Sequence, residues 1–233
     1  MRAPITPRRY SRRTLVSAAA LAALLGIGGA GSATAAAGHP ALAESALRSA
    51  AASHSSSSAA SSSRLTPFTV TSPDFRDGGP LPVSAEFGGQ FAAQVGCFGK
   101  NLAPELNWRH APAATAGYAL LVNDMDAALA GGWHHWIVYN IPGSATRLRG
   151  HGVLQYTQGS TSFDVNGIPV VGYGGPCPPA DGQTHHYIFT LYALSSSAPL
   201  AASLTYEQVL SAIAPSVVGS TVIIGTFRLP LKH

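Results

Sequence analysis

Beyond residue 65, apolar and β-branched residues recur in four short runs along the chain. Clusters of Gly and Pro separate these runs, as turns separate the strands of a β domain. The runs cover residues 118–123, 136–141, 187–194 and 222–227. The pattern predicts a mostly β domain, a β-sandwich whose first strand begins near Phe68.

A helical pattern stands out near the end of the chain. Thr205 and Gln208 are spaced as in a capping box, and Val209 and Ile213 lie on one face of the helix that would follow. Pro215 ends this helix. We therefore expect peripheral helices beside the sandwich.

The first 43 residues have the order of an export signal. Arg12 and Arg13 precede an apolar stretch, residues 15–27, and small residues follow. The arginine pair resembles a twin-arginine signal, and Sec export and an uncleaved membrane anchor are the alternatives. Cleavage sites compatible with the sequence follow Ala35, Ala37 and Ala43. We expect an exported protein, located in the periplasm, in the cell wall or outside the cell.

Residues 44–65 are almost entirely Ala and Ser, which predicts a disordered tether before a single domain at 66–233. Five of the 14 basic residues lie before Glu44 and no acid does, which leaves nine basic against ten acidic residues after the signal. The net charge of +4 therefore belongs to the signal. It gives no reason to expect a nucleic-acid partner, and membrane contact is expected only through the signal or a bound headgroup.

Two cysteines, Cys97 and Cys177, are present in the whole chain. An oxidising compartment would preserve a disulfide between them. Two separate thiols in the loops are the alternative, because the sequence does not show how closely their Cα atoms approach.

Two apolar, β-rich stretches, residues 133–142 and 185–192, contain histidines, among them His135 and His185. An imidazole buried in such a run costs free energy unless it finds a hydrogen-bond partner. These histidines therefore indicate a polar pocket at the ends of strands. Asp124 and Asp126, which follow a third apolar run, are the expected partners.

Strand alternation predicts which side chains share a face. His135 is expected on the same face as Ile137 and Tyr139. His134 and His186 fall on the opposite faces of their strands. We interpret these two histidines as solvent-facing or as supports behind the pocket.

Several motifs occur in a fixed order between about Thr66 and Arg228. They are the segment Asn101-Leu102-Ala103-Pro104-Glu105-Leu106-Asn107-Trp108, the pair Asp124-x-Asp126, the pair His135-Trp136, the run Gly172-Tyr173-Gly174-Gly175-Pro176-Cys177-Pro178-Pro179, and the pair His185-x-Tyr187. In this order they resemble the phosphatidylethanolamine-binding proteins, most closely their bacterial Raf kinase inhibitor-like branch of the YbhB/YbcL type. The resemblance implies a large central antiparallel sheet packed on a smaller one.

The resemblance also implies an anion pocket formed by Asp124, Asp126, His135, His185 and Tyr187. We expect a carboxylate to accept a hydrogen bond from an imidazole, which favours the protonated ring and directs its other N–H at the ligand. Tyr187 adds a neutral donor, and the amides of Gly174 and Gly175 complete an anion nest. The implied ligand is a phosphorylated small molecule or a lipid headgroup, with an affinity that rises as the pH falls.

The chain departs from the family pattern in three places. The loop Asp124-Met125-Asp126-Ala127-Ala128 lacks the two prolines usual there, residues 103–108 read Ala-Pro-Glu-Leu-Asn-Trp, and His186 replaces an arginine. None of these changes removes a pocket side chain. They change the expected charge and breadth of the pocket.

The expected function is non-catalytic binding without a cofactor. Modulation of an unknown protein partner is a further possibility that the sequence leaves open. A hydrolase, or an inhibitor of a hydrolase or kinase that uses the same pocket, is the alternative. No Gly-x-Ser-x-Gly elbow occurs, and Cys177 has no evident base. A metal site is a third class, but the histidine spacing lacks the helical signature of zinc motifs.

Overall fold

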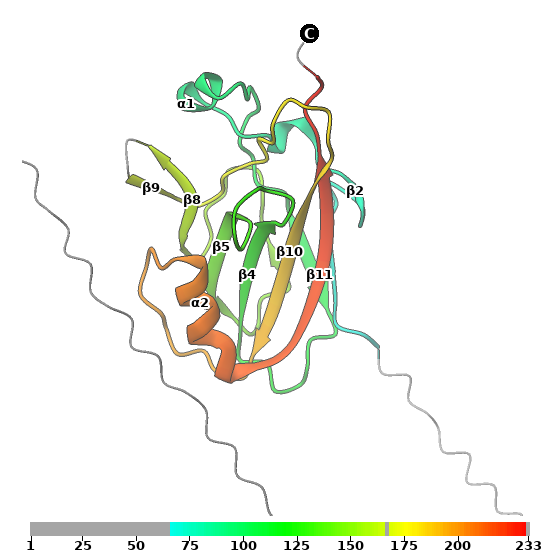
Figure 1. The fold of residues 1–233 in the computed structure, drawn as a ribbon. Coiled ribbons are helices and arrows are strands. Elements are labelled where there is room, and N and C mark those ends of the chain that lie inside the picture. Colours follow the sequence, from blue (N-terminus) through cyan, green and yellow to red (C-terminus); the bar gives the residue numbers. More distant parts are fainter. Residues whose placement is uncertain (1–65, 166–167, 232–233) are drawn as a thin grey trace, which may run out of the picture. The chain divides into compact units, whose positions relative to one another are not determined.

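The computed structural model describes residues 66–165 and 168–231 (Figure 1). The predicted export signal and tether lie outside the described residues. The strands are β1 (Thr69–Thr71), β2 (Gly79–Pro80), β3 (Leu106–Arg109), β4 (Gly117–Asp124), β5 (Trp133–Pro142), β6 (Arg147–Leu148), β7 (Thr157–Gln158), β8 (Ser160–Val165), β9 (Ile168–Val171), β10 (His185–Leu194) and β11 (Val217–Phe227). The helices are α1 (Gln90–Gln94) and α2 (Tyr206–Ile213), with short 3-10 turns η1 (Val83–Ala85) and η2 (Ala214–Ser216).

Six strands form the large sheet, in the order β2-β11-β10-β4-β5-β7. Its neighbours pair antiparallel, except that the edge strand β2 runs parallel to β11. A smaller sheet has the order β1-β3-β6, and β8 and β9 form a separate hairpin. The predicted mostly β fold, with a large sheet packed on a smaller one, is confirmed.

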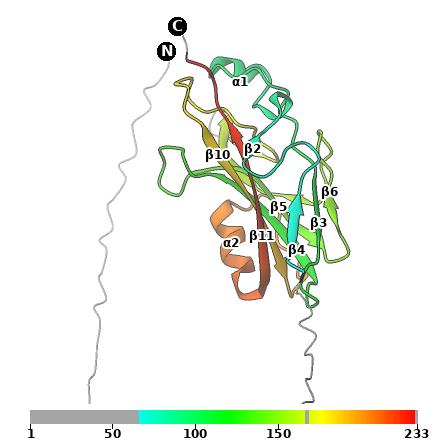
Figure 2. The same cartoon turned by 90° about the vertical axis from the view of Figure 1, so that its right-hand side faces the viewer.

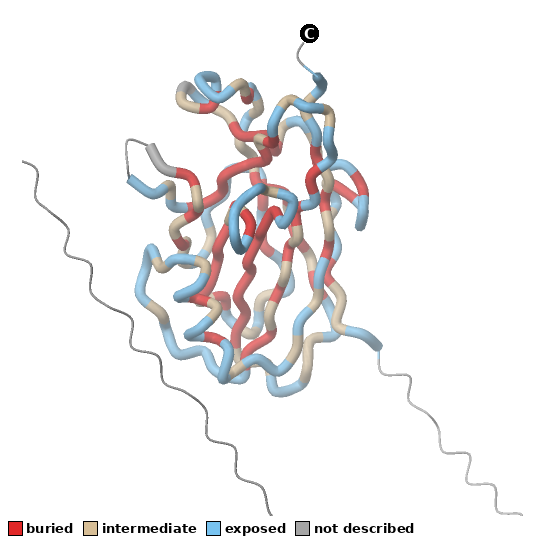
Figure 3. Tube along the Cα trace, viewed as in Figure 1, coloured by how far each residue is buried: buried red, intermediate tan, exposed pale blue. Residues whose placement is uncertain are grey.

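The main core lies between the two sheets. Apolar side chains of the small sheet, such as Leu106 and Trp108, pack against alternate residues of the large sheet, such as Leu120, Val122 and Phe189. These residues are almost completely buried, and Figure 3 shows the central strands β4 and β5 as the most continuously buried part of the fold. Burial of this apolar area is the main force that holds the sheets together.

Helix α2 covers the opposite face of the large sheet, as Figure 2 shows. Its residues Val209 and Ile213 pack against Leu121, Ile137 and Tyr139 of the central strands. The predicted capping box at the helix start is present: the Thr205 hydroxyl accepts from the Gln208 amide, and the Gln208 side chain accepts from the Thr205 amide. This helix is confirmed, and it lies on the face away from the small sheet.

A third apolar cluster lies at one end of the sandwich. It contains Phe87, Ala92 and Cys97 from one stretch of the chain and Phe163 from β8, far away in the sequence. Helix α1 is part of this end, and Figure 1 shows it above the ends of the large sheet. The cluster forms the support for the cavity described next.

Candidate functional site

A cavity of about 770 Å³ opens at the end of the large sheet where β4 ends and β5 and β10 begin. Ligand pockets of this size are common in proteins. The five side chains predicted for the pocket all line it: Asp124, Asp126, His135, His185 and Tyr187. The structure therefore brings the predicted set together, and their contact with a ligand stays a prediction.

Asp124 and His185 form a buried pair at the base of the cavity. The His185 Nδ1 lies 2.7 Å from the Asp124 Oδ2, and both side chains are largely shielded from solvent. Asp124 is the last residue of β4 and pairs in register with Tyr187 of β10. Residues directly opposite each other project from the same face of a sheet, so the antiparallel pairing places the carboxylate and the phenol side by side.

A β-bulge directs His135 into this group. In the pairing of β4 with β5, Val122 lies opposite Trp136 and Asn123 opposite His134, so His135 is an extra residue without a partner. Its ring packs edge-on against Tyr187, with centroids 4.9 Å apart. Beyond the bulge, alternation of side chains along β5 resumes with the two faces of the sheet exchanged.

The predicted facing of His135 is therefore wrong. Ile137 and Tyr139 pack under helix α2, on the opposite face of the sheet from Tyr187. Strict alternation would have placed the His135 ring under that helix too. The bulge brings the ring to the cavity instead.

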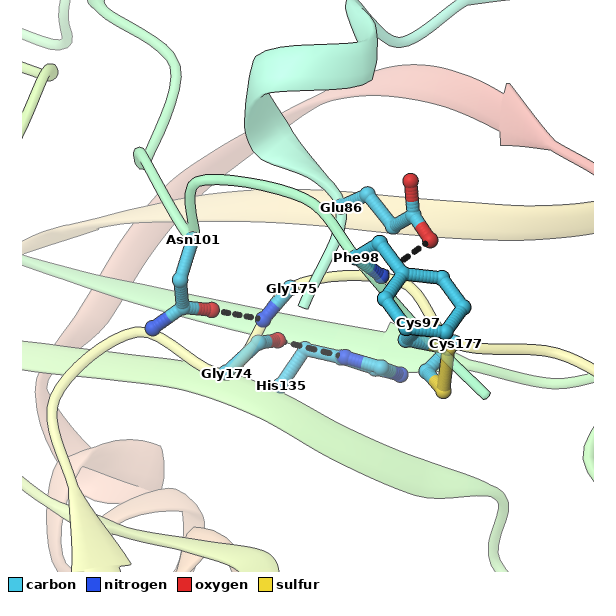
Figure 4. Close-up of a disulfide and its surroundings, with 8 residues drawn as sticks. All are labelled: Glu86, Cys97, Phe98, Asn101, His135, Gly174, Gly175 and Cys177. Atoms are coloured by element: carbon cyan, nitrogen blue, oxygen red, sulfur yellow. Dashed lines mark hydrogen bonds between the residues drawn. A yellow bond between two sulfur atoms is a disulfide. The ribbon is translucent and has the colours of Figure 1, made fainter. Parts of the chain in front are cut away.

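The His135 ring is held by the backbone rather than by a carboxylate. Its Nδ1 lies 2.7 Å from the Gly174 carbonyl oxygen, as Figure 4 shows. Burial lowers the pKa of His135 to about 4, and the Gly174 carbonyl and the charge of Asp124 oppose this only in part. The ring is thus neutral near pH 7. With Nδ1–H assigned to the Gly174 carbonyl, Nε2 carries a free lone pair and is an acceptor.

The Tyr187 hydroxyl is buried and makes no hydrogen bond of standard geometry among the described residues, although the Asp124 carboxylate lies next to it. Burial, and next the charge of Asp124, raise the pKa of Tyr187 above its usual value, so the phenol remains a neutral donor. The Trp133 Nε1 is likewise buried without a partner in the described part of the chain, and Trp133 lines the same cavity. A buried donor without a partner costs free energy that a bound acceptor can recover.

Asp126 lies at the exposed rim of the cavity. Its amide donates to the Asp124 carboxylate at 2.9 Å, and its own Oδ2 accepts from the amide of His186 at 2.7 Å and lies 2.8 Å from the His186 Nδ1. The slight burial of Asp126 would raise its pKa, but the hydrogen bonds from His186 outweigh this and lower the pKa. His186 is exposed, as predicted, and it supports Asp126 rather than the buried pair.

His134 lies outside this cavity. Its ring stacks on Tyr206 of helix α2, with centroids 4.0 Å apart, and its Nδ1 is 3.5 Å from Glu207. Burial lowers the pKa of His134, and Glu207 opposes that shift. Strand parity correctly predicted that this histidine lies away from His135.

The predicted anion nest at Gly174 and Gly175 is wrong. The Gly174 amide donates to the His135 carbonyl at 2.8 Å, and the Gly175 amide donates to the Asn101 Oδ1 at 2.7 Å. Both amides are therefore already bonded within the protein. Glycine is needed here for space, because a Cβ on Gly175 would meet the backbone of Ala85 and Phe87.

The rest of the cavity wall is mostly apolar. The apolar lining residues are Phe87, Phe91, Val95, Ala127, Ala128, Leu129, Trp133, Phe163, Pro178, Pro179, Ala180 and Leu229. No lysine or arginine lines the cavity within residues 66–165 and 168–231. The polar groups at the base are therefore neutral or acidic, apart from any proton taken up by histidine.

Cys97 and Cys177 form a disulfide across this wall, with Cα atoms 5.9 Å apart (Figure 4). Of the two alternatives, the structure shows the bonded form. Because the sulfur of Cys177 is bonded, it is not available as the thiolate nucleophile that a cysteine hydrolase requires. No cluster of three or more His, Cys, Asp or Glu suited to a metal ion occurs in the described part of the chain.

Comparison with known proteins agrees with this geometry. The family model for phosphatidylethanolamine-binding protein matches residues 71–228, which contain every cavity residue named above except Leu229. The chain belongs to the phosphatidylethanolamine-binding protein family. The family is named for binding rather than for a reaction, and its bacterial members LppC and YbcL do not carry enzyme names.

Three comparisons show how far this likeness extends. A protein of Mycobacterium tuberculosis named as a lipoprotein, LppC, is 42% identical over 163 residues, which are 70% of this chain and 73% of that protein. The UPF0098 protein YbcL of Escherichia coli is 36% identical over 143 residues, 58% of this chain and 73% of its own. The crystal structure of E. coli YbcL, described as a member of the mammalian PEBP family, superposes with a TM-score of 0.62 at 30% identity and covers 70% of this chain and 99% of the YbcL chain.

The lipoprotein name of the mycobacterial relative hints at an exported protein. In this chain both cysteines lie in the folded domain and are bonded to each other. No helix among the described residues is long and apolar enough to span a bilayer.

Proposed function

We propose that this protein is exported and holds a phosphorylated small molecule or a phospholipid headgroup in the cavity, without transforming it. The observation that supports this most directly is the Tyr187 hydroxyl, a buried donor without a partner among the described residues, at the base of a cavity. A phosphate oxygen is an acceptor that would satisfy it. The family name, phosphatidylethanolamine-binding protein, agrees with such a ligand.

The Asp124–His185 pair orients a second donor. With Nδ1–H directed at Asp124, the Nε2 of the His185 ring points away from the carboxylate. When the ring is protonated, this Nε2–H donates to a ligand anion. The 2.7 Å contact with the Asp124 carboxylate fixes the orientation of the ring.

The His135 Nε2 adds an acceptor to these donors. A ligand that fits both must carry an acceptor oxygen and a proton-bearing group. A phosphate monoester in its singly protonated form has both, and so does a headgroup with an ammonium. The second proton of a phosphate monoester is lost at a pH of about 6, so affinity is expected to rise as the pH falls from about 8 to about 6.

The test compares two buried tyrosine hydroxyls. In Tyr187→Phe, the unpartnered hydroxyl is lost, so affinity for phosphoethanolamine falls about tenfold while the free energy of unfolding is unchanged or slightly higher. In Tyr139→Phe, the lost hydroxyl donates to Ala201 at 2.6 Å and accepts from Leu204 at 3.2 Å, under helix α2. Stability therefore falls by about 1–3 kcal/mol and affinity stays the same.

Affinity is measured by titration calorimetry at pH 6 and pH 8, and stability by urea unfolding. Equal affinity of Tyr187→Phe and the natural protein would contradict the proposed role of the hydroxyl. An affinity that does not change between the two pH values would contradict the role of ligand protonation. Failure of phosphoethanolamine and inorganic phosphate to bind at either pH would contradict the proposed function itself.

A further inference from the structure

The disulfide lies in the wall of the ligand cavity. Cys177 is partly buried and lines the cavity, whereas Cys97 is completely buried behind it. His135 lines the same cavity as Cys177, and Figure 4 draws both the disulfide and the His135 ring. The two cysteines thus differ in access, because Cys177 lines the proposed ligand site and Cys97 does not.

Cys97 is covered by side chains from its own segment and from β8. It belongs to the apolar cluster of Phe87, Ala92 and Phe163, and Phe87 and Phe163 stack with centroids 4.5 Å apart. A reagent in solution cannot reach the Cys97 sulfur unless this cluster opens. Of the two cysteines, within the described structure, Cys177 alone lines a cavity open to solvent.

The disulfide also fixes one wall of the cavity. Phe91, Val95 and Gly96, in and just after helix α1, line the cavity immediately before Cys97 in the sequence. Among the described residues, the hydrogen bonds of this segment are formed within it or with the residues just before it. Examples are Gly99 N to Phe87 O at 3.1 Å and Phe98 N to Glu86 Oε1 at 3.0 Å. The disulfide is the covalent link between this wall and the loop that carries Cys177.

We propose that Cys177 is a site of thiol–disulfide exchange that is entered through the ligand cavity, so that a bound ligand and a reductant exclude each other. The inference rests on the proposed function only in that the ligand occupies this cavity. It assigns a redox-sensitive modification site to the binding site. Ligand occupancy then protects the link that holds the α1 wall in place.

The exchange follows ordinary thiol chemistry. The thiolate of a dithiol reductant attacks the Cys177 sulfur, a mixed disulfide forms, and the Cys97 sulfur leaves and takes up a proton. The second thiol of the reductant then attacks the mixed disulfide, releases the Cys177 thiol and closes the oxidised reductant. Two electrons pass from the dithiol to the protein disulfide. The leaving Cys97 sulfur is buried among apolar groups, which disfavours its thiolate and makes the exchange slow.

The test measures the rate at which dithiothreitol reduces the protein, by acid quenching, maleimide labelling and mass spectrometry. If exchange requires an empty cavity, the rate follows the fraction of unoccupied protein. Phosphoethanolamine at ten times its dissociation constant then slows reduction about elevenfold, and at its dissociation constant about twofold.

Low urea concentrations that do not unfold the protein leave the rate nearly unchanged. Acceleration as steep as that of global unfolding would mean that exchange occurs in the unfolded chain, and would overturn the inference.

A pair of substitutions at the rim tests access without any ligand. Val95 lines the cavity and is 56% exposed, so Val95→Ala widens the entrance and Val95→Trp narrows it. We expect reduction to be at least about twofold faster in the first variant and about twofold slower in the second, because exchange rates follow access to the sulfur. Val83, which is 71% exposed and does not line the cavity, is the matched control. Val83→Ala and Val83→Trp are expected to leave the rate unchanged.

The outcomes separate this inference from the proposed function. Phosphoethanolamine that binds but does not slow reduction overturns the inference alone. If phosphoethanolamine does not bind, the proposed function fails, and the Val95 variants still decide whether exchange occurs through the cavity. Equal reduction rates in both Val95 variants would then overturn the inference as well.

Discussion

His135 and His185 line the same cavity, but their surroundings assign them opposite roles. The Nδ1 of His185 faces a carboxylate at 2.7 Å, whereas the Nδ1 of His135 faces a backbone carbonyl at the same distance. In its protonated form the His185 ring offers its Nε2–H as a donor, whereas the neutral ring of His135 offers its Nε2 as an acceptor. The pair therefore offers one donor and one acceptor to a ligand.

The low pKa of His135 predicts a pH-dependent part of the stability. The ring ionises at about 4 in the folded protein and at about 6.5 in the unfolded chain, so the unfolded chain binds the extra proton between these values. The stability contributed by the neutral ring is present above about pH 6.5 and is lost as the pH falls towards about 4, by roughly 3 kcal/mol in total.

The measurement is urea unfolding of the natural protein and of His135→Gln from pH 7.5 to pH 4. The variant is less stable at pH 7.5 but loses less stability on acidification. His110→Asn, at an exposed position whose φ of 57° suits Asn, is the control and keeps the acid-induced loss of the natural protein. Parallel curves for the natural protein and His135→Gln would show that His135 is not the group that titrates.

The residue types at the cavity were readable from the sequence, but their hydrogen bonds were not. A histidine in an apolar run needs a partner, and that rule pointed to Asp124 and His185. The same rule does not distinguish a carboxylate from a backbone carbonyl, which is the partner of His135. Nothing in the sequence shows that the indole N–H of Trp133 is buried without a partner among the described residues.

At the scale of the elements, alternation predicted the strands well and failed where β4 and β5 lose register, at His135 and again near Tyr139 and Asn140. The four apolar runs became the cores of β4, β5, β10 and β11. The bulge at His135 inserts one residue, and a shift of one residue exchanges the two faces of a strand. No Gly or Pro marks this bulge in the sequence, so only the pairing of β4 with β5 reveals it.

The turn after β9 shows that a glycine can be required by packing rather than by backbone conformation. Gly172 has φ 110°, and the nearest atom to an added Cβ there is 3.9 Å away. Gly175 has no such φ, but an added Cβ would collide with the backbone of Ala85 and be 2.6 Å from the Phe87 nitrogen. The two glycines therefore resist substitution for different reasons.

The two alanine substitutions are expected to differ in both stability and binding. Gly172→Ala strains the backbone alone and costs about 1 kcal/mol, with unchanged affinity for phosphoethanolamine. Gly175→Ala pushes the loop away from η1, breaks the bond to Asn101 and costs about 3 kcal/mol, with weaker ligand binding because the wall moves. Urea unfolding and calorimetry check both. A Gly175→Ala protein as stable as Gly172→Ala would contradict the close packing.

At the scale of the whole molecule, the cavity depends on contacts between distant segments. Its residues come from the ends of β4, β5 and β10, from the segment around α1, from the β8 strand and from the chain after β11. The resemblance to a known family predicted that these segments meet in one pocket, whereas physical reasoning from the sequence alone predicted only some of the contacts. The sequence did not decide whether Cys97 and Cys177 are bonded, because the distance between two loops is a property of the finished fold.

The disulfide also makes a testable contribution to the stability of the whole domain. Cys97 and Cys177 are 80 residues apart, so their bond restricts a large loop in the unfolded chain. The chain-entropy model gives a stabilisation of about 4 kcal/mol for a loop of this size.

We expect Cys97→Ala/Cys177→Ala to lose this amount of stability in urea unfolding. The reduced natural protein has the same link removed but keeps both sulfur atoms, so a matching loss there assigns the effect to the bond. A loss below about 1 kcal/mol in both would mean that the unfolded chain already keeps these loops together, because the model counts only the freedom that the bond removes.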